Sequence, residues 1–340
     1  MEYVHKKENY NTAGIYAIIS EQENDEQWDS FVECNSAGFH EQTGMWASVK
    51  MLEGWNPVRI KFLQNHRIRG GFQILYKHKK YFGRIGYVSK GPLIDHYDSE
   101  LWQLMITRLI NTVKQYRIKA LIIIPSIYNF HEKPEFDKGL FNPNKIFPVI
   151  NATLQIDLTQ STEEILRGMR RRLRTSLKNT TELNFREGTR EELETFFELM
   201  LITCKNQQVT PNPSSLKSLQ KIWSLFSAKD LIKIYVAEKG NEIVSGILAL
   251  RIRDLFIAWK IGWSGKFRSL APNAALIWEM IKRAKKDGFK IFDFVSVDYR
   301  YAQLIKRKKP LTEVVIKNHT FFKLGFGGEI IRLPDSYIYI

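Results

Sequence analysis

The chain has 340 residues, a net charge of +15, a pI near 9.6 and 44% hydrophobic residues, enough for the cores of two ordinary domains. Its longest apolar runs are far too short to span a bilayer, and no apolar stretch follows a basic start, which argues against a membrane-spanning or secreted protein. We interpret Cys34 and Cys204, which lie far apart, as buried thiols, and we expect a cytoplasmic protein.

The charge favours an anionic partner, which is nucleic acid, a phosphorylated substrate or, through peripheral contact, an anionic membrane. Solvated lysines on a protein without such a partner would give the same total. Charge bears on association and leaves the fold open.

The first half of the chain predicts a strand, two short helices and a compact α/β unit. Apolar and β-branched runs predict strands at 15–20, 67–76, 81–88 and 118–125. Helical spacing predicts helices at 24–34, around Trp46 and at 99–116. Residues 130–148 are rich in Pro, Gly and Asn and are typical of a long loop between units.

The second half predicts the same kind of unit. Strands are expected at 152–158, 231–237, 242–253, 255–263 and 290–297, and helices at 191–205, 216–226 and 273–287. The order hairpin, helix, strand occurs in both halves, and Gly71 and Gly246 are 175 positions apart while Trp102 and Trp278 are 176 apart. Two units in register favour a duplicated α/β domain over two unrelated segments.

A strongly basic segment follows the strand at 152–158. Ser161 is expected to cap a helix that continues through RGMRRRLRTSLKN, and helical spacing then aligns Arg167, Arg171, Arg174 and Lys178 on one stripe. Phosphate binding would relieve the repulsion within such a stripe. A solvated basic face, partly paired with acids elsewhere, is the alternative.

The sequence lacks the common catalytic motifs. It has no Gly-x-Ser-x-Gly elbow, Walker loop or Gly-x-Gly-x-x-Gly element, and its seven histidines show no metal-binding spacing. This leaves transfer chemistry that depends on positioning and electrostatics, with an amine attacking an activated acyl group.

Four stretches resemble the FemABX family, the non-ribosomal peptidyltransferases that build peptidoglycan cross-bridges. They are EQTGMWASVKMLEGW, IRGGFQILYK with GYVSKGPLID, the 152–179 segment with its arginines, and APNAALIWEMIKRAKKDGFKIFDF with the later FFKLGFGG. The resemblance implies α/β architecture with mixed sheets in two tandem GNAT-like acyltransferase domains. The first would span 1–150 plus a returning segment of about 317–340, and the second 151–316.

The resemblance also implies an activity. Family members pass an aminoacyl group from aminoacyl-tRNA to an amine on a muropeptide precursor, and they need no metal or coenzyme A.

Site residues follow from matching the family's motifs. Lys50 resembles the lysine that holds substrate phosphate, and Tyr87 and Asp95 resemble residues of the peptide channel. Trp46, on the same predicted helix face as Lys50, is a further candidate for binding substrate, although an aromatic residue at helical spacing more often packs in the core. Lys323 in FFKLGFGG resembles the lysine proposed to steady the oxyanion. We expect a cleft between the domains, with Lys323 facing the donor and Lys50 and Tyr87 on the acceptor side, and we expect Lys323 to be a partly exposed cation that contributes little to folding.

The chain also departs from the family. Established cross-bridge enzymes carry an Arg and a Tyr four apart after the first helix of the second domain, where this chain reads VTPNPSSLKSL. An acyl-coenzyme A-dependent N-acyltransferase is therefore an alternative, although GKFRSLAPNA is a poor pyrophosphate loop. A non-catalytic module that binds RNA or an envelope precursor is another.

Overall fold

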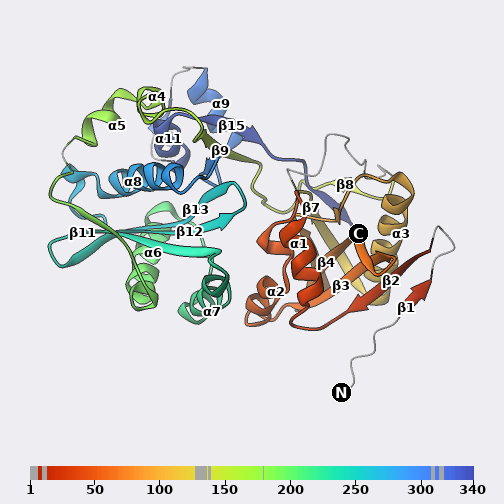
Figure 1. Ribbon diagram of the computed structural model, residues 1–340. Helices are drawn as coiled ribbons and strands as arrows, with labels where there is room; N and C mark the ends of the chain where they lie inside the picture. The colour runs from red at the N-terminus through yellow and green to blue at the C-terminus, as the bar shows by residue number, and fades with distance from the viewer. Residues whose placement is uncertain are drawn as a thin grey trace. The chain divides into compact units, whose positions relative to one another are not determined.

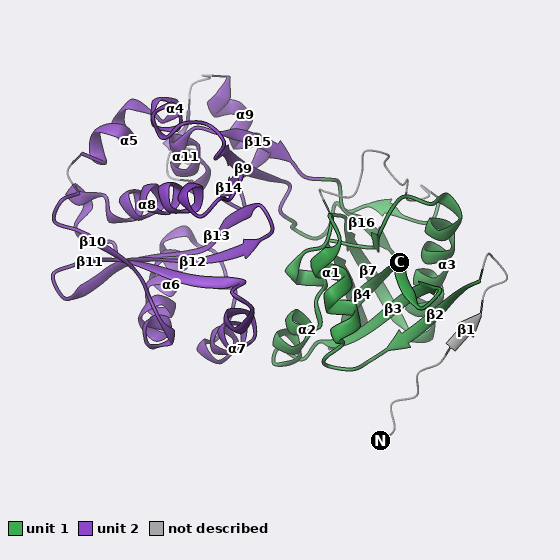
Figure 2. Ribbon diagram, viewed as in Figure 1, with its two compact units in different colours: residues 1–149, 334–340 green, residues 150–333 purple. Residues whose placement is uncertain are grey.

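The computed structural model describes residues 14–126, 136, 139–178, 180–307, 311–313 and 318–340, and the backbone of β1 (Lys7–Asn9). The chain forms two compact units, one made of residues 1–149 and 334–340 and the other of residues 150–333 (Figure 2). Each unit has its own sheet and its own hydrophobic core (Figure 1). Among the helices described, none is long and apolar enough to cross a membrane.

Unit 1 is a mixed sheet with helices packed against it. After β1 its elements are β2 (Ile15–Ser20), α1 (Glu26–Cys34), η1 (His40–Gln42), α2 (Gly44–Met51), β3 (Asn56–Gln64), β4 (Arg67–Lys79), β5 (Gly83–Ser89), β6 (Leu93–Ile94), α3 (Ser99–Gln115), β7 (Ile118–Ile124), β8 (Asn142–Pro143) and β16 (Tyr337–Tyr339). The sheet order is β1-β2-β3-β4-β5-β7-β16-β8, and β6 pairs with β4. Only β5 and β7 pair in parallel, because α3 carries the chain across the sheet between them.

Unit 2 repeats this plan. Its elements are β9 (Ala152–Asp157), α4 (Thr162–Gly168), α5 (Arg171–Ser176), β10 (Asn184–Glu187), η3 (Arg190–Glu192), α6 (Leu193–Gln207), α7 (Leu216–Phe226), η4 (Ser227–Lys229), β11 (Ile232–Lys239), β12 (Glu242–Ile252), β13 (Leu255–Trp263), η5 (Arg268–Leu270), α8 (Pro272–Lys286), β14 (Ile291–Asp293), α9 (Tyr299–Lys306), α11 (His319–Lys323), η6 (Leu324–Phe326) and β15 (Glu329–Arg332). The sheet order is β10-β11-β12-β13-β14-β9-β15, and the parallel pair is β13 with β14, joined through α8.

The duplication is visible in two glycines. Gly71 on β4 lies under the ring of Trp28 from α1, and Gly246 on β12 lies under the ring of Phe196 from α6. Each glycine lies on the strand beside the first strand of its unit's parallel pair, β4 beside β5 and β12 beside β13. Each of these strands is the second in a β-β-β-helix-β order. The structure therefore has the two tandem GNAT-like α/β domains that the sequence predicts.

Two expectations need correction. The returning segment begins at Pro334 and not near residue 317, because β15 pairs with β9 from Glu329↔Gln155 to Arg332↔Ala152 and so belongs to unit 2. Only β16 joins unit 1, between β7 and β8. The cysteines are not both buried, since Cys34 is exposed and Cys204 is half-buried.

The glycine under Trp28 generates a stability prediction. A Cβ at Gly71 would lie 2.3 Å from the Ile60 carbonyl oxygen and 2.8 Å from the Trp28 ring, so we expect Gly71→Ala to lower the free energy of unfolding by about 3 kcal/mol. A Cβ at Gly168 meets nothing within 4 Å, so Gly168→Ala is the matched control. Urea unfolding of both variants checks this, and equal stability would contradict the packing described.

Candidate active site

Lys323, at the end of α11, is held by main-chain oxygens at the end of β14. Its Nζ donates to the Phe294 oxygen at 2.9 Å and to the Ser296 oxygen at 2.6 Å. An ammonium group has three N–H donors, and these are its two hydrogen bonds to the described residues. Lys323 is half-buried, which agrees with the expectation of a partly exposed cation, and its two hydrogen bonds tie two distant segments together. The expectation that it contributes little to folding stays a prediction.

The turn that Lys323 holds is strained. Val295 has φ of +70°, a conformation that β-branched residues rarely adopt, and the Ser296 amide donates to the Phe294 oxygen at 2.9 Å. This i→i+2 bond makes residues 294–296 a γ-turn. Strain of this kind persists only where surrounding contacts enforce it, and such places are often functional.

Asp293 enforces the turn from the other side. Its carboxylate accepts from the Val295 amide at 2.5 Å, from Thr153 Oγ1 at 2.6 Å and from Gln155 Nε2 at 2.7 Å. Thr153 and Gln155 lie on β9, the strand beside β14. The turn is thus fixed between Asp293 and Lys323.

The sheet of unit 2 opens at this turn. β14 pairs with β13 only from Leu255↔Ile291 to Ile257↔Asp293, while β13 continues to Trp263. Beyond Asp293 the chain follows β9, since the Phe294 amide donates to the Leu154 oxygen. In unit 1 the corresponding strands stay paired to the end of β5 at Ser89.

Electrostatics at the turn favour an anionic ligand atom. Burial lowers the pKa of Lys323 to about 8, the Asp293 carboxylate acts to raise it, and the Lys260 ammonium of β13 lowers it further. Burial and the Lys323 charge lower the pKa of His319 to about 4, so this imidazole is neutral near pH 7. Two ammonium groups and one carboxylate leave a net positive site.

Sequence reasoning missed Asp293, Val295 and Lys260. Asp293 and Lys260 carried a signal, because each interrupts an otherwise apolar strand, in KIFDFVSV and LFIAWKIGW. Val295 carried none, since its residue type is typical of a strand.

Three of the residues predicted to bind substrate lie together in unit 1. The Trp46 indole donates to the Tyr87 hydroxyl, and Lys50 Nζ lies 5.0 Å from the Trp46 ring centre. Lys50 also forms a 2.8 Å ion pair with Glu53. Burial, with the charges of Glu41 and Glu53, raises the pKa of Tyr87 and keeps its hydroxyl protonated.

Residues beside this cluster extend it. The Trp55 ring packs edge-on against Tyr87 at 4.8 Å between centroids, and Lys77 Nζ lies 4.2 Å from the Trp55 ring centre. Burial lowers the pKa of Lys77, as do the charges of Lys79 and Lys50, while Glu53 raises it. Two ammonium groups therefore share Glu53, and the surplus positive charge suits an anion.

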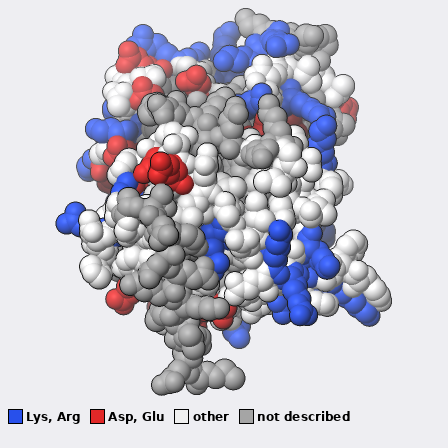
Figure 3. All heavy atoms as spheres, turned by 90° about the vertical axis from the view of Figure 1, so that its right-hand side faces the viewer, with Lys and Arg blue, Asp and Glu red and all other residues white. Residues whose placement is uncertain are grey.

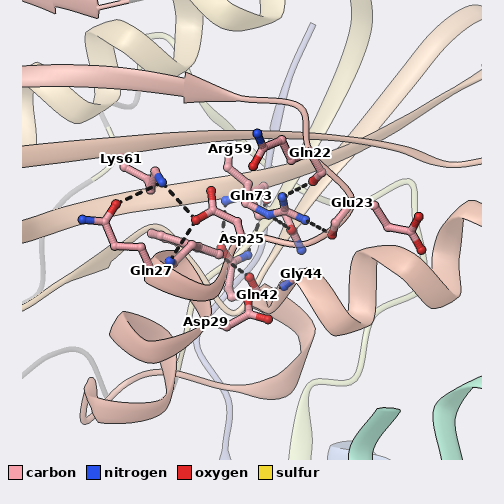
Figure 4. Close-up of polar contacts among 11 residues, drawn as sticks. Gln22, Glu23, Asp25, Gln27, Asp29, Gln42, Gly44, Arg59, Lys61 and Gln73 are labelled. Atoms are coloured by element: carbon pink, nitrogen blue, oxygen red, sulfur yellow. Dashed lines mark hydrogen bonds and ion pairs between the residues drawn. The ribbon is translucent and has the colours of Figure 1, made fainter. Parts of the chain in front are cut away.

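A buried polar network positions the helix that carries Trp46 and Lys50 (Figure 4). Arg59 is fully buried, and its Nε donates to Gln73 Oε1 at 2.6 Å. Gln73 in turn donates to the Thr43 oxygen, and Asp29 accepts from the Gly44 amide, where α2 begins. Burial lowers the pKa of Arg59, and the charges of Asp29 and Asp25 oppose that change.

Asp95 lies apart from this cluster along β4. Its neighbour Ile94 pairs with Gly70, whereas Tyr87 pairs with Leu75. The Asp95 carboxylate is bound by Arg69 Nε at 2.9 Å. Asp95 is therefore not brought together with Lys50, Trp46 and Tyr87.

The basic segment is not one helix, so the predicted stripe is wrong. Ser161 caps α4 as expected, but α4 ends at Gly168, Met169 is extended, and α5 starts at Arg171. Arg174 Nη1 turns back to donate to the oxygens of Arg167 and Met169 at 2.6 and 2.8 Å. Arg171 and Lys178 are exposed, as a phosphate contact would require.

The break docks the basic segment onto the FFKLGFGG motif. The Arg170 guanidinium stacks 3.8 Å from the Phe321 ring centre, and its Nη2 donates to the Phe321 oxygen. The Arg170 amide donates to the Gly325 oxygen at 2.8 Å. Two motifs that are distant in sequence thus form one structure around Lys323.

No group of three or more His, Cys, Asp or Glu side chains suited to a metal occurs among the residues described.

Arg174 and Arg171 are expected to differ when replaced. Arg174→Ala removes a donor from two oxygens at the end of α4, so we expect about 1–2 kcal/mol lower stability. Arg171→Ala should change stability by less than about 0.5 kcal/mol, because its side chain is exposed. Thermal unfolding measures both, and a reversed order would contradict the observed break.

Comparisons with known proteins agree with this geometry. Residues 23–139 match the FemAB family, and residues 161–303 match the acetyltransferase (GNAT) domain. A relative from Staphylococcus haemolyticus named Lipid II:glycine glycyltransferase is 28% identical, with 80% of this chain and 83% of the relative covered. A protein of that name from Staphylococcus epidermidis is also 28% identical, but the match covers 52% of this chain and 46% of the relative.

Solved structures agree on the fold. The crystal structure of FemX superposes with a TM-score of 0.73 at 18% identity, covering 93% of this chain and 95% of FemX. A tandem GNAT protein from the clavulanic acid biosynthesis pathway gives a TM-score of 0.50 at 8% identity, covering 95% and 98%. From the FemAB match, the glycyltransferase relatives and the tandem GNAT-like units, we conclude that this chain belongs to the FemABX family.

Proposed function

We propose that this chain is an aminoacyltransferase that passes an aminoacyl group from aminoacyl-tRNA to an amine of a peptidoglycan precursor peptide. The observation that carries the proposal is Lys323, fixed by two main-chain oxygens at the opening between β13 and β14. The names of the glycyltransferase relatives support the acceptor class.

The chemistry needs one cation in a fixed place. The acceptor amine attacks the ester carbonyl of the donor, a C–N bond forms, and the carbonyl oxygen becomes an oxyanion. The third N–H of Lys323 donates to this oxygen. Collapse then breaks the C–O bond to the ribose, which leaves as a hydroxyl after taking a proton, while the attacking nitrogen loses one.

The fixed geometry makes Lys323 suited to this role. Because Phe294 and Ser296 hold two of its protons, the ammonium need not reorganise when charge develops on the substrate. Its third donor has no acceptor among the described residues and is assigned here to the acyl oxygen.

The remaining residues are assigned to the two substrates. Lys50, Trp46 and Tyr87 would bind the acceptor, with a substrate phosphate competing with Glu53 for Lys50. Exposed Arg171 and Lys178, with Arg167, would contact phosphates of the tRNA, whereas Arg174 is structural. Asp95 remains a candidate for the peptide channel.

An acyl-coenzyme A-dependent N-acyltransferase is the second candidate, favoured by the GNAT match over residues 161–303. The helix start that would bind a pyrophosphate is α8. It begins at Pro272, which has no N–H, and its cap residue Ala271 makes no side-chain cap bond. This weakens the coenzyme A alternative. A non-catalytic binding module stays the third, because VTPNPSS still lacks the family's Arg and Tyr.

Replacing Lys323 tests the mechanism. We expect Lys323→Met to lower turnover roughly 10²- to 10³-fold, the usual loss for one oxyanion donor. Lys285→Met is a matched control, because Lys285 Nζ also donates to two main-chain oxygens, those of Leu158 and Gln160, at the other end of β9. Both variants should lose similar stability, and only Lys323→Met should lose turnover.

The assay uses charged total tRNA and, separately, acyl-coenzyme A donors, with a lysine-bearing muropeptide as acceptor. Transfer from tRNA alone supports the proposal, and transfer from acyl-coenzyme A alone establishes the second candidate. Binding of tRNA without transfer from either donor would favour the non-catalytic module. Equal turnover in Lys323→Met and Lys285→Met would remove Lys323 from the chemistry.

The pH dependence gives an independent check. Because burial lowers the pKa of Lys323 from 10.5 to about 8, turnover should fall as pH rises through about 8. Unfolding does not explain such a fall. Between pH 8 and pH 10.5 Lys323 is protonated in the unfolded chain and deprotonated in the folded chain, so its contribution to the free energy of unfolding rises with pH there. A turnover profile that is flat to pH 10 would contradict a protonated Lys323.

A further inference from the structure

The tip of the β4–β5 hairpin presents two aromatic side chains to solvent. Tyr81 is 89% exposed and Phe82 is 75% exposed, more than any other aromatic residue in the described part of the chain. Single exposed apolar residues are common on proteins, but two adjacent aromatics this exposed are not explained by packing.

The turn itself does not require aromatic residues. Lys79 pairs with Gly83 across the hairpin, and the Phe82 amide donates to the Lys79 oxygen at 3.1 Å. Tyr81 has φ of +73°, a left-handed conformation that favours Gly, Asn or Asp. Backbone strain and exposed apolar surface therefore occur together at Tyr81 and Phe82. This combination indicates that the two residues serve a role other than stabilising the fold.

Basic side chains surround these two aromatics. They come from the hairpin and from the stretch that runs from the last turn of α3 into β7. This stretch lies beside the hairpin because Arg84 pairs with Ile118 and its Nη1 donates to the Tyr116 oxygen. The basic residues are Lys79, Lys80, Arg84, Lys114, Arg117 and Lys119. Figure 3 shows that Lys and Arg side chains gather in groups on one face of the molecule.

We propose that this hairpin tip is a docking surface for an anionic lipid bilayer. Aromatic rings are favourable at the depth of the lipid headgroups, and each nearby Lys or Arg strengthens binding to an anionic leaflet about fivefold. A convex tip of two residues is small for a protein interface, which needs about 800 Å² on each partner. The surface uses no residue of the Lys323 site.

Vesicle flotation of the full chain tests the proposal at about 0.1 M salt. The probes are phosphatidylcholine vesicles with 30% phosphatidylglycerol and vesicles of phosphatidylcholine alone, neither of which contains an acceptor substrate. We expect binding to the anionic vesicles only. Lys79→Gln with Lys80→Gln should weaken it roughly 25-fold, at about fivefold for each lysine.

Replacing the aromatics separates insertion from charge. Tyr81→Asn with Phe82→Ser should weaken binding roughly tenfold while the melting temperature stays equal or rises, because Asn suits the left-handed turn. Lys205→Gln with Lys217→Gln removes the same charge from exposed positions of unit 2 and should leave binding unchanged.

Several outcomes would overturn the proposal. They are no binding of the unaltered chain to anionic vesicles, equal losses from the hairpin and the unit 2 lysine pairs, or no effect of the aromatic replacements. Loss of tRNA binding with intact vesicle binding in the hairpin variants would make this an RNA surface instead. The aminoacyl transfer assay is separate, so either hypothesis can fail alone.

Discussion

The contact between the Lys323 ammonium and the oxygens of Phe294 and Ser296 holds the candidate active site together. It ties α11 to the end of β14 and keeps Val295 in a conformation that the residue would not choose alone. Asp293 completes the restraint by accepting from Thr153, Gln155 and the turn itself. An ammonium held in this way is oriented before any substrate arrives, which is the arrangement that electrostatic catalysis requires.

The two units put one architecture to different uses. In unit 1 the parallel pair of β5 and β7 is closed, and the buried polar network around Arg59 fixes the start of α2. Such a network is costly to disrupt, because a buried guanidinium without its acceptors is strongly destabilising. In unit 2 the corresponding pair separates after three residue pairs. The two units thus differ in how far the strands of their parallel pair stay together.

Apolar periodicity and turn residues in the sequence were enough to predict several of the helices and strands. The strand at 255–263 has the predicted bounds, β12 ends one residue early, and α8 begins and ends one residue before its predicted bounds. Apolar periodicity and turn residues decide such elements. The strand predicted at 290–297 ends at Asp293, whose side chain accepts a hydrogen bond from the Val295 amide.

Features set by distant contacts could not be predicted. The helix break at Met169 depends on the Gly325 oxygen, and the burial of Lys323 depends on a turn near residue 295. Resemblance to a family indicated Lys50, Tyr87, Asp95 and Lys323 as candidate site residues without giving their partners. It could not show that Arg174 serves the backbone or that Glu53 occupies Lys50.

The position of β16 has a consequence for biosynthesis. This strand lies between β7 and β8, and Ile338 is buried in the core of unit 1. The ribosome makes β16 only after the whole of unit 2. While unit 2 emerges and folds, unit 1 has an incomplete sheet in which β7 presents an unpaired edge. A nascent chain at that stage offers a site for mispairing with other strands, so protection by a chaperone would matter most then.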